Sequence, residues 1–98
     1  MKMDVEEILE NRYDILEFFY DARTESGLEV LEIKSDTFDE KLRKHIDLTT
    51  FNIRYLTDGG YLHEKTINEG NKSMPAYYIT AKGIELFEKK YLEKNKDL

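Results

Sequence analysis

The sequence predicts an α+β fold in a single domain of residues 1–98. Apolar residues recur at helical spacing near both ends of the chain and in its middle, which is typical of amphipathic helices. Before the last of these segments, two aromatic and β-branched runs flank a polar stretch, the pattern of a β-hairpin. A chain of 98 residues suits one domain, and no linker or internal repeat divides it.

The first helix is predicted from Val5 to about Ala22. Asp4, followed three residues later by Glu7, forms the N-cap pattern of a helix start. Residues 24–27 include a serine and a glycine and are expected to end the helix. Apolar side chains cover more than half of its circumference, so we expect it to pack on two sides. These side chains are Val5, Ile8, Leu9, Tyr13, Ile15, Leu16, Phe18, Phe19 and Tyr20.

A short strand and a second helix are predicted to follow. Residues 28–33 mix branched apolar residues with glutamates, as a half-buried strand does, and Ser35 and Asp36 bound them. Thr37 and Glu40 then form a capping box, which indicates the start of a helix of about ten residues. Along one face of this helix, apolar positions recur at four-residue steps, at Phe38, Leu42, and His45 or Ile46.

The third helix is predicted over residues 48–58, with Asp47 as its N-cap. Gly59 and Gly60 are expected to end it, because a glycine adopts the left-handed backbone that a helix C-terminus favours.

A helical wheel divides this third helix into two faces. Thr50, Arg54 and Thr57 fall together and form the exposed polar side. The opposite arc is mostly apolar and is expected to face the core, which is the preferred location for Phe51 and Tyr55. The members of this arc are Leu48, Phe51, Asn52, Tyr55 and Leu56, with Ile53 beyond them.

A hairpin and a last helix complete the prediction. Residues 61–67 and 74–80 form its strands, and residues 68–73 form a polar connection of about six residues. Thr80 is expected to cap the last helix, which frays from Lys94 onward. Its apolar stripe consists of Ile84, Phe87 and Tyr91.

Composition excludes several classes of function. Without cysteine there is no disulfide, no thiolate nucleophile and no cysteine-based metal site. His45 and His63 lack a second ligand at metal-binding spacing, and no nucleophile motif or phosphate-binding glycine loop is present. We therefore expect no enzyme activity, no metal and no cofactor. The acidic N-terminus and the lack of a long apolar run predict neither a signal peptide nor a membrane span, and hence a cytoplasmic protein.

Two local strings resemble winged-helix DNA-binding proteins. Residues 55–62 read YLTDGGYL, similar to the end of the recognition helix and the turn into the wing in winged-helix regulators. Residues 78–83 read YITAKG, similar to the point in MarR- and PadR-type regulators where the second wing strand ends and a Thr-capped helix begins. The resemblance covers residues 37–91, and it covers the first 35 residues by pattern alone.

This resemblance implies a winged helix, with a three-helix core that contains a helix-turn-helix, a short strand, a β-hairpin wing and a C-terminal helix. In such families the third helix enters the major groove of double-stranded DNA, the hairpin contacts the backbone or minor groove, and the terminal helices often form a homodimer. The chain would then be a small transcriptional regulator, with its recognition helix at about residues 48–58 and its wing at about residues 61–80.

Within this interpretation, the guanidinium of Arg54 suits a guanine edge, and the neighbouring hydroxyls suit bases or phosphates. Basic and amide side chains of the hairpin and the second helix suit the DNA backbone. The residues expected to contact DNA are Lys44, Thr49, Thr50, Arg54, Thr57, Lys65, Asn71 and Lys72.

The same residues also suit purely structural roles. Any surface helix needs a solvated face such as the one that carries Arg54. Lys41, Arg43 and Lys44 suit local ion pairs with Asp39 and Glu40, and a hairpin turn needs polar residues whatever it binds.

Charge favours an alternative function. The net charge is −6, and residues 1–35 carry the whole excess, with four basic and ten acidic residues. DNA phosphates repel an acidic protein at long range, and DNA-binding modules are typically basic on one face. The alternative is a winged-helix module for protein–protein interaction that does not bind DNA, with a partner protein at the aromatic-rich first helix.

Overall fold

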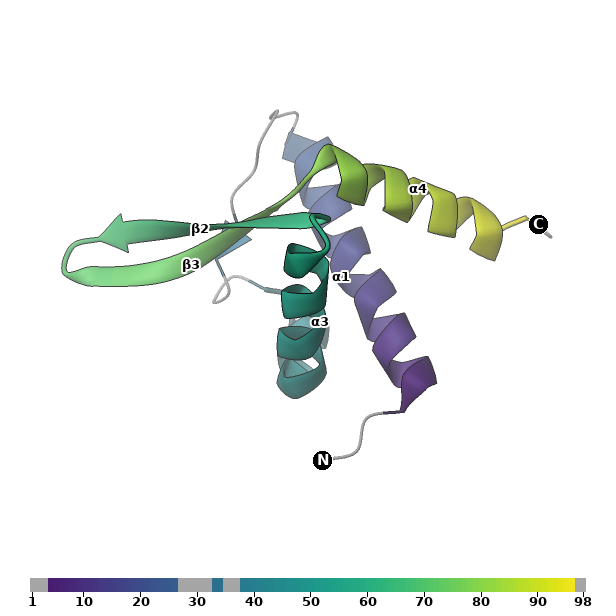
Figure 1. The fold of residues 1–98 in the computed structure, drawn as a ribbon, viewed down its shortest axis with the longest axis horizontal. Helices are drawn as coiled ribbons and strands as arrows, with labels where there is room; N and C mark the ends of the chain where they lie inside the picture. Colours follow the sequence, from purple (N-terminus) through teal and green to yellow (C-terminus); the bar gives the residue numbers. More distant parts are fainter. Residues whose placement is uncertain (1–3, 27–32, 35–37, 97–98) are drawn as a thin grey trace.

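The computed structural model describes residues 4–26, 33–34 and 38–96, and confirms the α+β class (Figure 1). Within these residues there are four helices and one antiparallel sheet of three strands in the order β1-β3-β2. The elements are α1 (Val5–Ser26), β1 (Ile33–Lys34), α2 (Glu40–Lys44), α3 (Ile46–Asp58), β2 (Leu62–Glu69), β3 (Lys72–Ile79) and α4 (Ala81–Lys94).

Helix α1 begins as predicted and ends one turn later than predicted. The Asp4 carboxylate accepts a hydrogen bond from the Glu6 N–H at 2.8 Å, which confirms the N-cap. The predicted end near Ala22 is wrong, because the Thr24 hydroxyl donates to the Tyr20 carbonyl within the continuing helix (3.0 Å). Arg23 donates to the Ile79 carbonyl at 3.1 Å and so fastens the last turns of α1 to β3.

Helix α2 is shorter than predicted. It spans Glu40–Lys44, and its N-cap is Asp39, whose carboxylate accepts from the Leu42 N–H at 2.9 Å. The predicted ten-residue helix with a Thr37–Glu40 capping box is therefore wrong; Thr37 itself lies outside the described residues. A carboxylate is at least as good a cap as a hydroxyl, so the later acid determines the start.

The predicted start of α3 is also wrong. A single residue, His45, ends α2 and precedes α3, and its non-helical backbone (φ −116°, ψ 52°) makes the break between them. Helix α3 consequently begins at Ile46, and Asp47 lies inside its first turn instead of capping it.

The C-terminus of α3 ends in a Schellman turn. Tyr61 N–H donates to the Leu56 carbonyl at 2.8 Å, and Gly60 N–H donates to the Thr57 carbonyl at 3.1 Å. Gly60 takes the left-handed backbone with a φ of +82°, as predicted, whereas Gly59 remains right-handed at −80°. Only one of the two glycines therefore needs its conformational freedom here.

The hairpin has a much tighter turn than the predicted six-residue connection, which is wrong. The strands pair continuously from Leu62 opposite Ile79 to Glu69 opposite Lys72, which leaves Gly70 and Asn71 as the turn. Gly70 has a φ of +62°, as the first central residue of a II′ turn requires. Of the strand predicted over residues 28–33, only Ile33 lies within the described residues, and it pairs with Tyr77 of β3.

Helix α4 begins as predicted. The Thr80 hydroxyl accepts from the Gly83 N–H at 3.1 Å, and the helix runs to Lys94. A Cβ at Gly83 would overlap the Tyr61 carbonyl oxygen, so the absence of a side chain lets α4 lie against the turn that follows α3.

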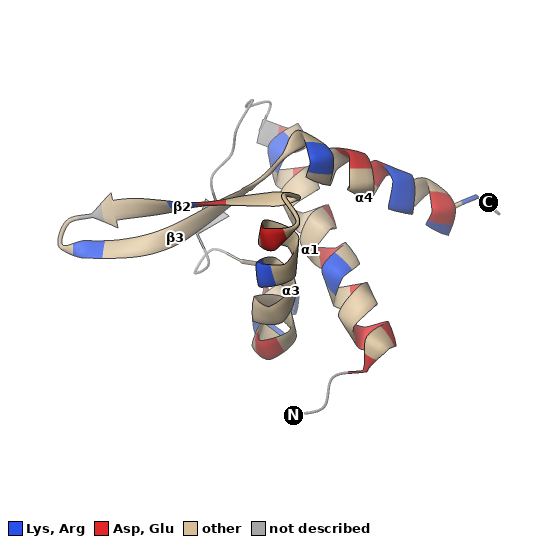
Figure 2. Ribbon diagram, viewed as in Figure 1, with Lys and Arg blue, Asp and Glu red and all other residues tan. Residues whose placement is uncertain are grey.

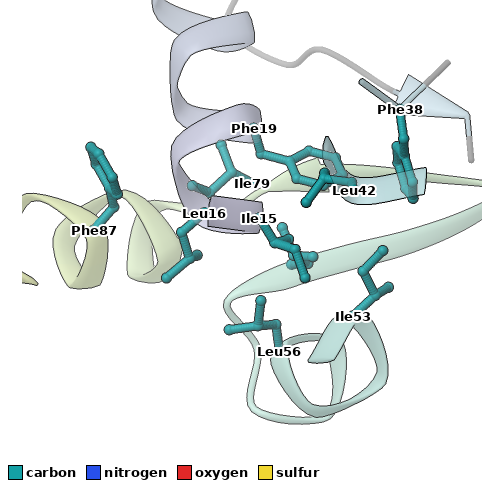
Figure 3. Close-up of a cluster of buried hydrophobic side chains, with 10 residues drawn as sticks. Ile15, Leu16, Phe19, Phe38, Leu42, Ile53, Leu56, Ile79 and Phe87 are labelled. Carbon is teal, nitrogen blue, oxygen red and sulfur yellow. The ribbon is translucent and has the colours of Figure 1, made fainter. Parts of the chain in front are cut away.

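The core lies where α1 meets the other elements. Helix α1 packs on both α3 and α4, as its broad apolar circumference predicts, and Figure 3 shows Ile15, Leu16 and Phe19 pointing into the cluster. The other buried members are Phe38, Leu42, Ile53, Leu56, Leu62, Ile79 and Phe87. Among the described residues, no helix has the length and apolar character needed to cross a membrane.

Candidate nucleic-acid interface

The exposed side of α3 and the base of the hairpin meet in a concave corner. Because α3 ends in a tight turn, β2 starts beside its last residues and the hairpin projects away from the helix (Figure 1). The structure places Thr50 and Arg54 on the exposed side of α3, as predicted, and both line this corner. Glu64 of β2 and Tyr77 of β3 line its other side.

Thr57 lies in the same corner with an unused hydroxyl. The prediction of Thr57 as a member of the exposed polar side is wrong, because Thr57 is half-buried; its Oγ1 atom is buried and has no hydrogen-bond partner among the described residues. Buried hydroxyls usually have a partner, and leaving one without a partner is unfavourable by about 1 to 3 kcal/mol. A polar group that entered the corner would satisfy this hydroxyl.

Thr49 lies behind the wall of this corner and is fully buried, so its prediction as a DNA contact is wrong. Its side chain is 0% exposed. The Thr49 hydroxyl donates to the Leu42 carbonyl at 2.9 Å and accepts from the Asn11 side-chain amide at 3.1 Å. Thr49 therefore holds α3 against α1 and α2 from the inside.

Asn52 completes a polar network between α1 and α3 that the sequence analysis did not identify. Its amide nitrogen donates to the Asn11 side-chain oxygen (2.8 Å) and to the Ile8 carbonyl (2.9 Å). Its side-chain oxygen accepts from Arg12 Nε at 3.1 Å. The available signal was an asparagine on the arc predicted to be buried, since a buried amide requires partners. We name Asn11, Arg12, Thr49 and Asn52 the polar lock.

Phe51 and Tyr55 were predicted to lie in the core, and this prediction is wrong. Their exposed fractions are 46% and 47%. The polar lock rotates α3 so that Thr49 and Ile53 face inward in their place. Tyr55 has one face covered by the Arg12 guanidinium, 3.7 Å from the ring centroid.

Glu64 and Tyr77 are polar members of the corner that were not among the predicted site residues. They face each other across the β2–β3 ladder, and the Tyr77 hydroxyl donates to Glu64 Oε1 at 3.1 Å. Burial, and then this hydrogen bond and the Glu64 charge, raise the pKa of Tyr77, whereas nearby Arg54 opposes the rise. Strand alternation could have found Glu64, because it lies on the same face of β2 as the buried Leu62.

The remaining predicted contacts lie on the hairpin and on α2. Asn71 and Lys72 are exposed at the hairpin turn, Lys65 is exposed on β2, and Lys44 is exposed in the last turn of α2. Lys41 forms an ion pair, at 3.1 Å, with Asp14 of α1 instead of the neighbouring acids of its own helix.

The charge of this surface is mixed. Both acidic and basic residues occur along α3 and the hairpin (Figure 2). These two elements contain three lysine or arginine residues, Arg54, Lys65 and Lys72, and four acids, Asp47, Asp58, Glu64 and Glu69. One copy of the chain thus presents few cations to a phosphate backbone.

Two further observations concern metal binding and similarity to known proteins. Within the described ranges, no group of three histidine, cysteine or acidic residues is placed to hold a metal ion. His63 packs its ring on Tyr78 with centroids 4.9 Å apart. No family model matches the chain, and no curated protein or solved structure matches it significantly.

Proposed function

We propose that the chain is a non-enzymatic DNA-binding regulator of the winged-helix class, with α3 as its recognition helix and the β2–β3 hairpin as its wing. The observation that carries the proposal is the corner in which Thr50 and Arg54 face solvent beside an antiparallel hairpin. The four-helix layout with its hairpin is compatible with this class.

Each surface side chain has a part in the proposed complex. Arg54 donates to a guanine edge in the major groove, and Thr50 contacts a neighbouring base or phosphate. Lys65, Asn71 and Lys72 hold the backbone from the wing. Strands of eight residues extend the hairpin by about 25 Å, enough to follow the backbone away from the recognition helix. Lys44 adds a backbone contact from α2.

The polar lock supports this proposal because it fixes the rotation of α3 relative to α1. Base contacts are effective only when the helix that carries them keeps its rotation, and the lock ties α3 to α1 at two asparagines and a threonine.

We also propose that the chain binds DNA as a homodimer. A single copy has few cations, so two copies on one duplex would supply the phosphate contacts that one lacks. Apolar side chains of the terminal helices are available for pairing, since Val5 and Leu9 of α1 are 68% and 53% exposed.

The test is fluorescence anisotropy with a labelled duplex enriched from a randomised pool, at about 25 and about 150 mM KCl. We expect binding that weakens steeply with salt and weakens about tenfold on Arg54→Ala, because one bidentate base contact is lost. Lys89→Ala on α4 removes one exposed positive charge elsewhere and serves as the matched control. Absence of binding at the lower salt concentration, or equal effects of the two substitutions, contradicts the proposal.

A second function is favoured by one observation. Phe51 and Tyr55 are about half exposed on α3, and exposed aromatic side chains of this kind are typical of protein interfaces. In that case α3 contacts a partner protein, and the chain acts as an adaptor without binding DNA. Crosslinking in cells distinguishes the two: loss of a crosslinked protein in Phe51→Ala but not in Arg54→Ala, together with no DNA binding, supports the adaptor.

A further inference from the structure

Two grooves flank the contact between α1 and α4, and their charges differ. One groove is lined by Tyr13 and Tyr55 and carries charges of both signs, three cations (Arg12, Lys90 and Lys94) and two acids (Glu10 and Glu93). The other, which we name the acidic groove, has an aromatic floor and three carboxylates, and none of its lining residues is basic. Its main members are Tyr20, Phe87 and Tyr91, with Glu17, Asp21 and Glu88 around them.

In the first groove, the protein's own cations cover the aromatic rings. Arg12 lies 3.7 Å from the Tyr55 ring centroid, and Lys94 Nζ lies 3.9 Å from that of Tyr13. The ring faces attract a cation through their quadrupole, and the chain supplies that cation itself.

In the acidic groove, the rings with exposed surface are those of Tyr91 and the half-buried Tyr20, and Phe87 lies beneath them in the core at 5% exposure. The Tyr20 and Phe87 centroids are 4.6 Å apart, Phe87 and Tyr91 are 6.1 Å apart, and Tyr91 is 48% exposed. In the part of the chain that the structure describes, no lysine or arginine lies over these rings or forms an ion pair with the three carboxylates. The hydroxyl of Tyr20 donates to Glu88 at 2.8 Å and holds that carboxylate at the rim.

We propose that the acidic groove binds an organic cation, a drug-sized molecule with an apolar or aromatic body and a quaternary or delocalised positive charge. The volume of the groove, about 540 Å³, suits such a molecule. Aromatic faces and carboxylates both attract a positive charge, and here they line one concavity.

Spacing selects this ligand over other cations. The three carboxylates do not form a cluster that could hold a metal ion, as far as the described residues extend, so the charge they suit is spread over a larger body. Along the helices, the groove extends only from Glu17 to Asp21 and from Phe87 to Leu92, little more than one turn of each. That length fits a compact molecule and is short for a basic peptide helix.

The test uses two ions of the same shape and opposite charge, tetraphenylphosphonium and tetraphenylborate, in calorimetric titrations of the full chain. We expect the phosphonium to bind at one site per chain. The double variant Glu17→Gln with Asp21→Asn keeps the shape of the groove and removes two charges, so it is expected to weaken phosphonium binding at least tenfold. Tetraphenylborate binding should stay unchanged or strengthen in that variant.

A matched control pair lies on α1 outside the groove. Glu6→Gln together with Glu7→Gln removes the same charge from the start of α1, about 15 Å along the helix from Glu17, and should change phosphonium binding less than about twofold, because exposed charges beyond a Debye length are screened by salt. A further variant lies inside the groove and tests the contribution of the ring. Tyr91→Leu keeps an apolar side chain but removes the aromatic ring, so it should weaken phosphonium binding about fivefold.

Three results would overturn the proposal: no phosphonium binding up to about 1 mM, equal responses of the two ions to the double variant, or an equal effect of the control pair. Thermal melts of each variant check that the fold is intact. The acidic groove shares no residue with the corner of α3 and the hairpin, so its failure and the failure of DNA binding are separate outcomes.

Discussion

The two sides of α3 differ in how completely their polar groups are satisfied. On the inner side, Thr49 and Asn52 use their side chains in bonds to α1 and α2. On the outer side, Thr50 and Arg54 face solvent, and the buried Thr57 hydroxyl has no partner among the described residues. The inner hydrogen bonds therefore hold α3 against its neighbours, whereas the side chains of Thr50 and Arg54 remain in solvent.

The largest effect on stability is expected from a substitution that removes hydrogen bonds on the inner side of α3. Asn52→Ala removes bonds to Asn11, Ile8 and Arg12 and leaves a buried amide unsatisfied, so it should lower the free energy of unfolding by about 3 kcal/mol. Urea denaturation measures this change. Asn71→Ala at the exposed hairpin turn is the control and should change stability by less than about 0.5 kcal/mol. Similar losses in the two variants would show that the lock is unimportant.

Two neighbouring threonines, Thr49 on the inner side of α3 and Thr50 on the outer side, allow the same substitution to be compared on both sides. Thr49→Val keeps the shape but removes the hydroxyl that pairs with Leu42 and Asn11, at a cost of about 2 kcal/mol in unfolding free energy. The same change at exposed Thr50 should leave stability within about 0.5 kcal/mol and weaken DNA binding instead. Thermal melts and anisotropy on both variants measure the two effects, and a stability loss at Thr50 equal to that at Thr49 would contradict the assignment of faces.

A substitution on the outer side of α3 is expected to change DNA binding and to leave stability nearly unchanged. Arg54→Ala should leave the urea midpoint nearly unchanged, because the side chain is exposed, and weaken DNA binding by about 1.4 kcal/mol. An unfolding loss above about 1 kcal/mol would show instead that Arg54 has a structural role.

A smaller effect is expected at Glu64, the acid in the corner. Glu64→Gln removes a negative charge from the surface proposed to meet phosphate, so non-specific DNA affinity should rise about threefold at low salt. Glu88→Gln, which removes an acid far from α3 and the hairpin, should change that affinity much less. A decrease in affinity on Glu64→Gln would indicate that Glu64 accepts a hydrogen bond from a base.

The smallest effect concerns pH. The fold raises the pKa of Tyr77, so the native state holds the phenol proton more tightly than the unfolded chain does. The resulting stability is fully present below pH 10, the ordinary value for tyrosine, and is lost as the pH rises through the pKa of the folded state. Urea midpoints above pH 10 should therefore fall less steeply in Tyr77→Phe than in the parent chain. Equal slopes would show that Tyr77 is not the group responsible.

Errors in the sequence predictions have local physical causes. Asp4 and Thr80 were identified as caps because a cap needs only the two or three N–H groups that follow it. At α2 the capping-box pattern pointed to Thr37, whereas in the structure the Asp39 carboxylate caps the helix. At the hairpin, the positive φ of Gly70 permits a two-residue turn where the polar composition suggested a longer loop.

The sequence predicted the environment of some α3 residues correctly and that of others wrongly. Thr50 and Arg54 were placed correctly, but Thr49, Phe51 and Tyr55 were assigned to the wrong environments. Hydrophobicity favoured burying the two aromatic residues, whereas satisfied hydrogen bonds make Thr49 and Asn52 suitable interior residues. Because those bonds join residues 38 and 41 positions apart, no local pattern contains them.

The sequence by itself determined the α+β class, the caps of α1 and α4, the glycine that ends α3 and the two strands of the hairpin. Each of these depends on backbone conformation or hydrogen bonds within a few residues of the chain. Only the tertiary structure decided the rotation of α3, the contents of the corner beside the hairpin and the charges of the two grooves between α1 and α4. Those features arise where distant segments meet, so partners from several elements determine which polar groups are satisfied and which remain available.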